Sequence, residues 1–201
     1  MTITLFELAG AEPDRRFSPY CWRTRLALAH KGLAVETIAW RFTDKEAIAK
    51  SGQGRVPVLM DGDKVVWDSW TIAGYLEDTY PDRPSLFGGA EARHLTHFIN
   101  SWADAVVNAA LVPILLTDIY AHLHEKDRPY FRESREKRFG MALDQVSAAG
   151  DTRVVGFRQS IEPARTILAS QPYLAGERPL YADYILFGCF MWHAASAGSG
   201  Y

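Results

Sequence analysis

The chain has 201 residues, 48% of them hydrophobic and 23% charged, with a formal net charge of -2. This length and composition are typical of a globular protein with one large domain or two small ones. The weak net charge gives no indication of a nucleic acid or an anionic membrane surface as a partner. The two cysteines, Cys21 and Cys189, form no disulfide framework and favour a reducing compartment, the cytoplasm.

Neither of the two most apolar stretches, 105–116 and 184–195, is predicted to cross a bilayer. Each is shorter than the roughly 20 residues that a membrane-spanning helix needs. The first also contains Asn108 and Pro113. The chain begins without a basic region followed by an apolar core, so no signal peptide is predicted.

Strand and helix patterns alternate over the first eighty residues. Apolar or alternating runs predict strands at 3–8, 35–40, 56–60 and 64–67. The turn Asp61-Gly62-Asp63 indicates that the last two strands form a hairpin. Ser18 as N-cap and Pro19 at the first helical position predict a helix after the first strand. A second helix is predicted from Asp68-Ser69.

The order strand, helix, strand, hairpin and helix predicts an α+β, thioredoxin-like domain over 1–80. A Pro- and Gly-rich linker at 81–90 separates it from an all-helical domain over 91–201. Pro113 is predicted to kink or split the first helix of the second domain. The helices are predicted near 91–123, 128–149, 159–171 and 181–195, with loops at 150–157 and 197–201.

The pattern Ser18-x-x-Cys21 is similar to a thioredoxin-type C-x-x-C motif whose first cysteine has become serine. The N-terminus of a helix favours a negative charge. Ser18 is therefore a candidate for stabilising the thiolate of a bound molecule, and the alternative is that it is only a helix cap. Cys21 lies one turn into the helix and is interpreted as a small buried hydrophobic residue.

The free-energy estimate is consistent with this role for Ser18. Lowering a thiol pKa from about 8.5 by two units requires about 2.7 kcal/mol. A helix N-terminus contributes roughly 0.3–2 kcal/mol. A hydrogen bond to a charged group contributes roughly 1.5–3 kcal/mol. Together these suffice without a general base.

Four motifs in this order resemble the glutathione S-transferase superfamily over the whole chain. They are Ser18-Pro19, Arg55-Val56-Pro57-Val58-Leu59, Asp68-Ser69 and Ala182-Asp183. Within the superfamily, five segments are similar to bacterial glutathione-dependent β-etherases of lignin breakdown and their serine-type fungal relatives. These segments are Ser18-Pro19-Tyr20-Cys21-Trp22-Arg23-Thr24, Asp68-Ser69-Trp70, Tyr80-Pro81-Asp82-Arg83-Pro84, Ser134-Arg135-Glu136-Lys137-Arg138 and Ala182-Asp183-Tyr184-Ile185.

This resemblance implies a glutathione site. Val56-Pro57 would form a cis-proline turn whose valine backbone pairs with the cysteinyl part of glutathione as an added strand. The alternative is an edge strand that begins with proline. Asp68-Ser69, also a plausible simple helix cap, would hold the γ-glutamyl end. Arg55 and Arg41 would bind the glycyl carboxylate, although a solvated surface position is the simpler interpretation of Arg41.

Two features depart from the family pattern. Leu180 stands where the family usually has a capping Ser, Thr or Asn, so the capping box before Asp183 is incomplete. The family also usually continues beyond the helix that holds Phe190 and Trp192, so a terminal segment that walls the second-substrate pocket is expected to be missing here.

The resemblance implies a cytoplasmic, homodimeric glutathione transferase acting on an apolar, aromatic electrophile, with cleavage of β-aryl ethers as the specific reaction. The alternatives are a general detoxifying transferase or peroxidase, and a non-catalytic glutathione-binding module. No metal site is predicted, because no Cys or carboxylate cluster accompanies the histidines. The segment 132–138 is interpreted as a solvated helix face, and Phe98, Trp102 and Tyr120 as candidates to line a pocket facing Ser18.

Overall fold

The computed structural model describes residues 2–148 and 150–196. Its N-terminal part is a four-stranded sheet in the order β2-β1-β3-β4, with β1 and β2 parallel and the other pairs antiparallel. The strands are β1 Ile3–Leu8, β2 Val35–Trp40, β3 Val58–Asp61 and β4 Lys64–Trp67. The helices of this part are α1 Pro19–His30, the 3-10 helix η1 Lys45–Ser51 and α2 Ser69–Thr79.

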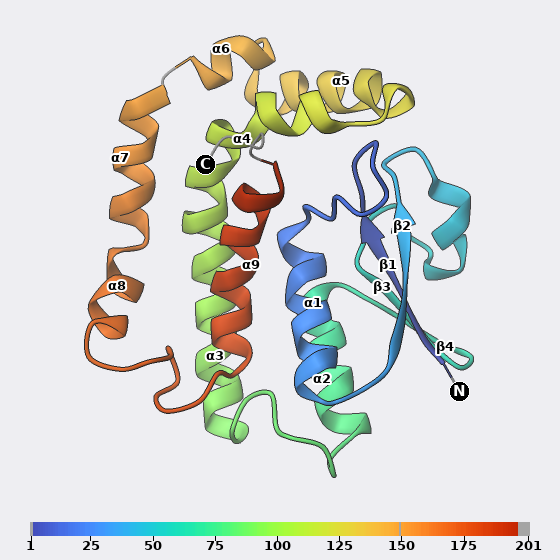
Figure 1. The fold of residues 1–201 in the computed structure, drawn as a ribbon, viewed down its shortest axis with the longest axis vertical. Helices are drawn as coiled ribbons and strands as arrows, with labels where there is room; N and C mark the ends of the chain where they lie inside the picture. The colour runs from blue at the N-terminus through green and yellow to red at the C-terminus, as the bar shows by residue number, and fades with distance from the viewer. Residues whose placement is uncertain (1, 149, 197–201) are drawn as a thin grey trace.

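From Ala90 onward, the described chain is built from helices joined by loops, with no further strand (Figure 1). The elements are α3 Ala90–Trp102, η2 Ala103–Val107, α4 Asn108–His122, η3 Glu125–Asp127, α5 Arg128–Phe139, α6 Leu143–Ser147, α7 Gly150–Ser160, α8 Glu162–Leu168 and α9 Tyr181–Ser196. The predicted fold class, a thioredoxin-like domain followed by an all-helical domain, is confirmed. The terminal loop predicted at 197–201 lies outside the described residues.

The helix predicted at 91–123 is nearly continuous, but Pro113 does not split it. Pro113 lies inside α4, and the regular helix is interrupted earlier, at the π-helical turn η2. Together, α3 to α4 span Ala90–His122, which is long and apolar enough to cross a membrane, unlike the shorter stretch 105–116 alone. Half of its most apolar window is buried within the protein, and core helices pass the same test.

Two other predictions for this domain were wrong, one for a helix and one for a loop. The segment 128–149 breaks at Gly140, which adopts a positive φ of 69° and ends α5, as glycine commonly does after a helix. The segment 150–157, predicted as a loop, belongs to α7. Phe157 of α7 contacts Phe190 of α9 at a ring-centroid distance of 6.2 Å, so tertiary packing overrides the weak local helical signal.

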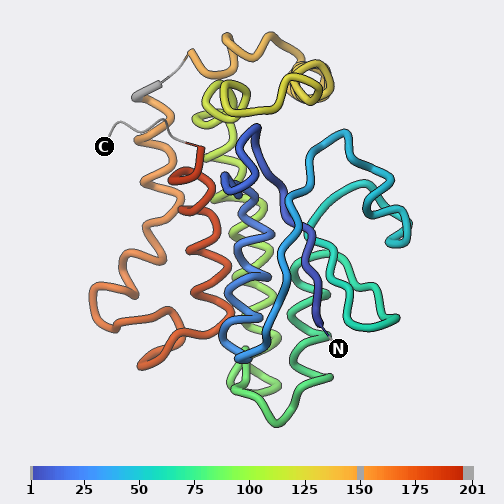
Figure 2. The backbone as a smooth tube through the Cα atoms, turned by 45° about the vertical axis from the view of Figure 1, so that its right-hand side comes forward, coloured from blue at the N-terminus to red at the C-terminus, as the bar shows by residue number. Residues whose placement is uncertain are grey.

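Helix α9 joins the two parts of the molecule. It lies alongside α1 in both views and also contacts α3 and α4 (Figures 1 and 2). Gly188 of α9 permits this approach, because an added Cβ would stand 2.6 Å from the Pro19 carbonyl oxygen. The side chain of Asp183 accepts hydrogen bonds from the backbone N–H groups of Leu174 and Leu180, at 2.7 and 3.0 Å. Asp183 therefore binds backbone donors although Leu180 supplies no side-chain cap.

Candidate functional site

Ser18 is the N-cap of α1, as predicted, and its hydroxyl keeps a proton to donate. Its Oγ accepts a hydrogen bond from the backbone N–H of Cys21 at 3.3 Å. Among the hydrogen bonds of the described residues, the Ser18 hydroxyl donates none. The side chain is only 4% exposed, yet it lines a cavity of about 500 Å³. A hydroxyl both accepts and donates, so Ser18 can offer its O–H to an anion in this cavity.

The sheet register brings Val56 and the start of α1 to the same edge. Phe6 of β1 is paired with Val58 of β3, so the residues before Val58 lie beside the end of β1, from which the chain runs on to Ser18. The Val56-Pro57 peptide bond is cis, as predicted. Val56 lines the same cavity as Ser18, and Pro57 is buried next to it.

Asp68 and Ser69 begin α2 at the same edge of the sheet. Val58 pairs with Trp67 across the hairpin, so Asp68 lies close to Pro57. Asp68 caps the helix by accepting from the backbone N–H of Thr71 at 2.9 Å. Its φ of 70° is uncommon for a residue other than glycine. Asp68 and Ser69 do not line the cavity itself.

The two arginines proposed for the glycyl carboxylate occupy different surroundings. Arg55 is exposed and lines the cavity beside Val56. Arg41 instead donates to the backbone carbonyls of Gly10 and Ala11, at 3.2 and 3.0 Å, and does not line the cavity. Three of the predicted site residues, Ser18, Arg55 and Val56, therefore meet in one cavity.

The helical domain closes this cavity with one stripe of the α3–α4 helix. The residues Asp104, Asn108, Val112 and Leu116 follow each other at intervals of four and line it. Phe98 and Trp102 lie on a different face and line a separate, largely apolar cavity of about 800 Å³. Tyr120 lines neither of these cavities. The prediction that Phe98, Trp102 and Tyr120 line a pocket facing Ser18 was therefore wrong. The aromatic lining of the Ser18 cavity comes from Phe17, Tyr20, Trp40, Phe42, Tyr130, Phe131 and Trp192.

The segment 132–138 is not simply a solvated face. Arg135 and Arg138 of α5 line the Ser18 cavity together with Phe131 and Ser134. Their spacing from Phe131, at four and seven residues, is the sequence signal for one helix face. Arg132, in contrast, pairs with Glu136 along the helix at 3.1 Å.

A buried ion pair supports the helix that bears Ser18. The Arg23 guanidinium is fully buried and donates to Asp104 Oδ1 at 2.9 Å and to Asn100 Oδ1 at 3.0 Å. The same guanidinium lies 4.8 Å from the centre of the Tyr20 ring. Burial, with the negative charge of Asp104, raises the pKa of Tyr20, so its phenol stays protonated and is a second possible donor in the cavity.

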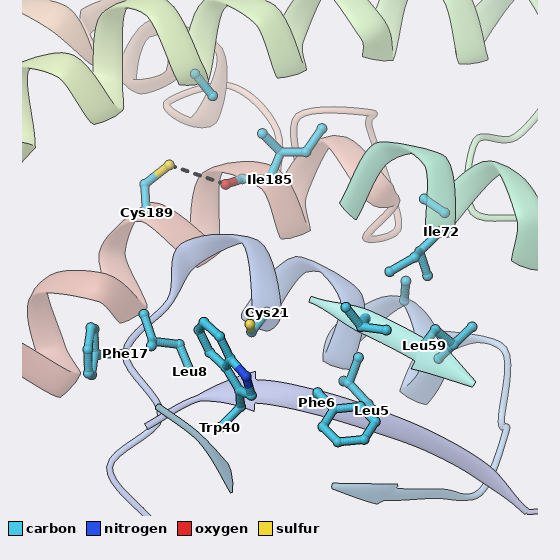
Figure 3. Close-up of a cluster of buried hydrophobic side chains, with 14 of the residues drawn as sticks. Leu5, Phe6, Leu8, Phe17, Cys21, Trp40, Leu59, Ile72, Ile185 and Cys189 are labelled. Carbon is cyan, nitrogen blue, oxygen red and sulfur yellow. Dashed lines mark hydrogen bonds between the residues drawn. The ribbon is translucent and has the colours of Figure 1, made fainter. Parts of the chain in front are cut away.

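Cys21 is fully buried, as predicted (Figure 3). It lies in the cluster of hydrophobic side chains that includes Leu8 and Trp40. Burial raises the pKa of the Cys21 thiol to about 12. The thiolate is the nucleophilic form of cysteine, so Cys21 is unsuited to thiol–disulfide chemistry at neutral pH.

These features define a class of protein: a thioredoxin-like domain with a cis-proline beside a serine at a helix N-terminus, completed by an all-helical domain. Family models agree with this description. The model for the glutathione S-transferase N-terminal domain matches residues 13–84. The model for the glutathione S-transferase C-terminal domain matches residues 94–200, more than half of the chain. The chain belongs to the glutathione S-transferase family.

The curated relatives are distant in sequence. Glutathione transferase omega-1 of Caenorhabditis elegans is 28% identical over 91% of this chain and 64% of its own length. Glutathione S-transferase 1 of Dianthus caryophyllus is 32% identical over 54% of this chain and 50% of its own length. The chain thus spans half to nearly two thirds of these two curated relatives.

Two solved structures from fungi match almost the whole chain. Glutathione transferase GSTFuA3 from Phanerochaete chrysosporium has a TM-score of 0.89 and 28% identity, covering 98% of this chain and 86% of that one. A glutathione S-transferase of Ceriporiopsis subvermispora in complex with glutathione has a TM-score of 0.88 and 27% identity, covering 98% and 87%.

Proposed function

We propose that this protein binds glutathione along the edge formed by Ser18, Val56 and the start of α2, and transfers its thiolate to an aromatic electrophile. The observation that carries the proposal is the Ser18 hydroxyl, which accepts from Cys21 and keeps its own proton for a ligand in the cavity. Glutathione in the complex of the Ceriporiopsis subvermispora relative supports this choice of thiol.

The chemistry required of the protein is stabilisation and positioning of the thiolate. The α1 N-terminus and the Ser18 O–H would favour the anionic sulfur. The specific reaction that we propose is attack on the β-carbon of a β-aryl ether ketone. A carbon–sulfur bond forms, the carbon–oxygen bond breaks, and the phenolate leaves and takes a proton from water.

The reaction is tested with a β-aryl ether ketone that releases a fluorescent phenol. Glutathione-dependent release of the phenol, together with a thioether product of the expected mass, supports the proposal. Turnover of 1-chloro-2,4-dinitrobenzene or cumene hydroperoxide without ether cleavage would indicate a general transferase or peroxidase. Saturable glutathione binding without any turnover would indicate a non-catalytic module.

Glutathione binding itself predicts a role for the start of α2. The Ser69 side chain is buried, and the Ser69 carbonyl is fixed by the Tyr181 hydroxyl at 2.7 Å. Ser69→Ala and Asp68→Ala should each weaken glutathione binding in calorimetry. The loss of one hydrogen bond to the charged γ-glutamyl end corresponds to roughly tenfold or more in Kd. Ser101→Ala on α3, outside the Ser18 cavity, is the matched control. If Asp68→Ala and Ser69→Ala both bind like the parent, the site lies elsewhere.

We also propose that the protein is a homodimer in the cytoplasm. Leu95 and Phe98, three residues apart on α3, are 71% and 70% exposed, and their burial against a second copy would remove apolar surface from water. Both cysteines are free and buried, which is compatible with a reducing compartment. Sedimentation equilibrium should give twice the chain mass for the parent and a shift toward monomer for Leu95→Glu. A monomeric parent would contradict the dimer.

A further inference from the structure

Three arginines gather at the Ser18 cavity, and the described residues offer them no acidic partner. Arg135 and Arg138 reach the cavity from α5, and Arg55 reaches it from the loop before β3. None of the three takes part in an ion pair within residues 2–148 and 150–196. Other arginines do have such partners, for example Arg132 with Glu136 on the same helix.

Arg135 is the most enclosed of the three. Its guanidinium lies 4.6 Å from the Phe131 ring centre and 5.6 Å from that of Phe42, and its only hydrogen bond in the described structure goes to the Ser134 hydroxyl at 3.0 Å. Burial, together with the positive charges of Arg138 and Arg55, lowers the pKa of Arg135. An anion between these groups would relieve that mutual repulsion.

The cavity has an aromatic wall next to the arginines. The Phe42 ring lies 5.9 Å from the Tyr130 ring and 5.8 Å from the Phe131 ring.

Ser18 and Asp104 also line this cavity, and Asp104 is paired with Arg23. Asp104 and Ile119 both line it, and at about 1.5 Å per residue they lie about 22 Å apart along the helix. The Tyr120–Phe131 contact, at 6.4 Å, places α5 near the Ile119 end.

We propose that the electrophile carries a carboxylate, bound by Arg135 and Arg138, on an aromatic body that lies against Phe42, Tyr130 and Phe131. Guanidinium groups match carboxylates with paired hydrogen bonds. Arg55, next to Val56, remains the candidate for the glycyl carboxylate of glutathione. This inference rests on the proposed function, and it narrows the substrate class from apolar aromatics to aromatic acids.

The test compares two electrophiles that differ in one charge, 4-chloro-3,5-dinitrobenzoate and 4-chloro-3,5-dinitrobenzamide. In both, the glutathione thiolate displaces chloride from the aromatic ring. Each kcat/KM is divided by the uncatalysed rate constant at the same pH, which removes the difference in intrinsic reactivity. The parent protein should favour the carboxylate by about tenfold or more, as expected for a charge-assisted hydrogen bond. A ratio near one would overturn the inference.

Variants of α5 assign that preference to the two arginines. Arg138→Gln and Arg135→Gln should each lower the carboxylate-to-amide ratio by about tenfold, and Arg135→Lys should restore part of it. Lys137→Gln, which removes the same charge from the exposed side of the helix, should keep the parental ratio. If Lys137→Gln and Arg138→Gln lowered the carboxylate-to-amide ratio equally, the preference would come from the overall surface charge, and the inference would be overturned.

Two further measurements separate the rival explanations. The arginine variants are assayed with γ-glutamylcysteine, which lacks the glycyl carboxylate. If the substitutions lower activity with glutathione but not with γ-glutamylcysteine, and leave the electrophile ratio parental, these arginines serve glutathione and the inference is wrong. If no electrophile is turned over, the proposed function fails, and calorimetry with 4-nitrobenzoate and 4-nitrobenzamide decides the inference. Tighter binding of the benzoate, lost in Arg138→Gln, supports it, and equal binding overturns it.

Discussion

Ser18→Ala should reduce the rate of glutathione conjugation at pH 7 by about tenfold or more, with partial recovery at higher pH. The variant loses a hydrogen bond to an ion, which contributes roughly 1.5–3 kcal/mol. That loss should raise the pKa of the bound thiol by about one to two units. At pH 7 the thiolate fraction therefore falls, and it returns as the pH rises through the new pKa. The α1 N-terminus remains, so the effect of the helix on the thiolate is retained.

The pH profile of kcat/KM for Ser18→Ala, set beside that of Ser18→Thr, tests this account. Threonine keeps a hydroxyl and remains a good N-cap, so Ser18→Thr should retain a profile close to the parental one. If Ser18→Ala also kept the parental profile, the thiolate would be held by another donor. Tyr20, which lines the same cavity, would then be the first candidate, and Ser18 would act only as the cap of α1.

Asp104→Leu should destabilise the folded protein by about 3 kcal/mol, because it leaves the fully buried Arg23 guanidinium without its ionic partner. This loss of stability lies at the low end of the range for breaking a buried ion pair. The Asp104 side chain is 35% exposed, and Asn100 still accepts a hydrogen bond from the Arg23 guanidinium. Arg23 joins α1 to the α3–α4 helix, so the loss should also loosen the helix that positions Ser18.

A double-mutant cycle identifies the cause of that loss. Arg23→Met combined with Asp104→Leu removes both charges, so the double variant should be more stable than Asp104→Leu alone. Urea unfolding at constant pH measures each free energy. Additive losses for the two substitutions would contradict the ion-pair explanation and attribute the effect of Asp104→Leu to altered packing around η2.

The thioredoxin-like domain could be predicted closely because its signals are local. Ser18 with Pro19 indicated the start of α1, and Asp61-Gly62-Asp63 indicated the β3–β4 hairpin. The strand pattern alone did not fix the register. The role of Val56 was expected from the family resemblance, and the register of β1 with β3 places the residues before Val58 beside the end of β1.

The lining of the cavity from the helical domain was harder to predict, since it depends on which helix face turns toward α1. Phe98 and Trp102 have the helical spacing of pocket residues but line the other cavity. The π-helical turn η2 changes the phase of the long helix, and no residue signals it in the sequence. Arg135 was interpreted as solvated because its charge outweighed its spacing of four residues from Phe131.

The most direct test of the central claim is the ultraviolet absorbance of the glutathione thiolate, titrated with pH in the presence of excess protein. If Ser18 and the start of α1 hold the sulfur as an anion, the bound thiol should titrate about two units below its free value of about 8.5. A bound thiol that titrates like free glutathione, at protein concentrations where calorimetry shows saturation, would contradict the claim that this protein stabilises a thiolate.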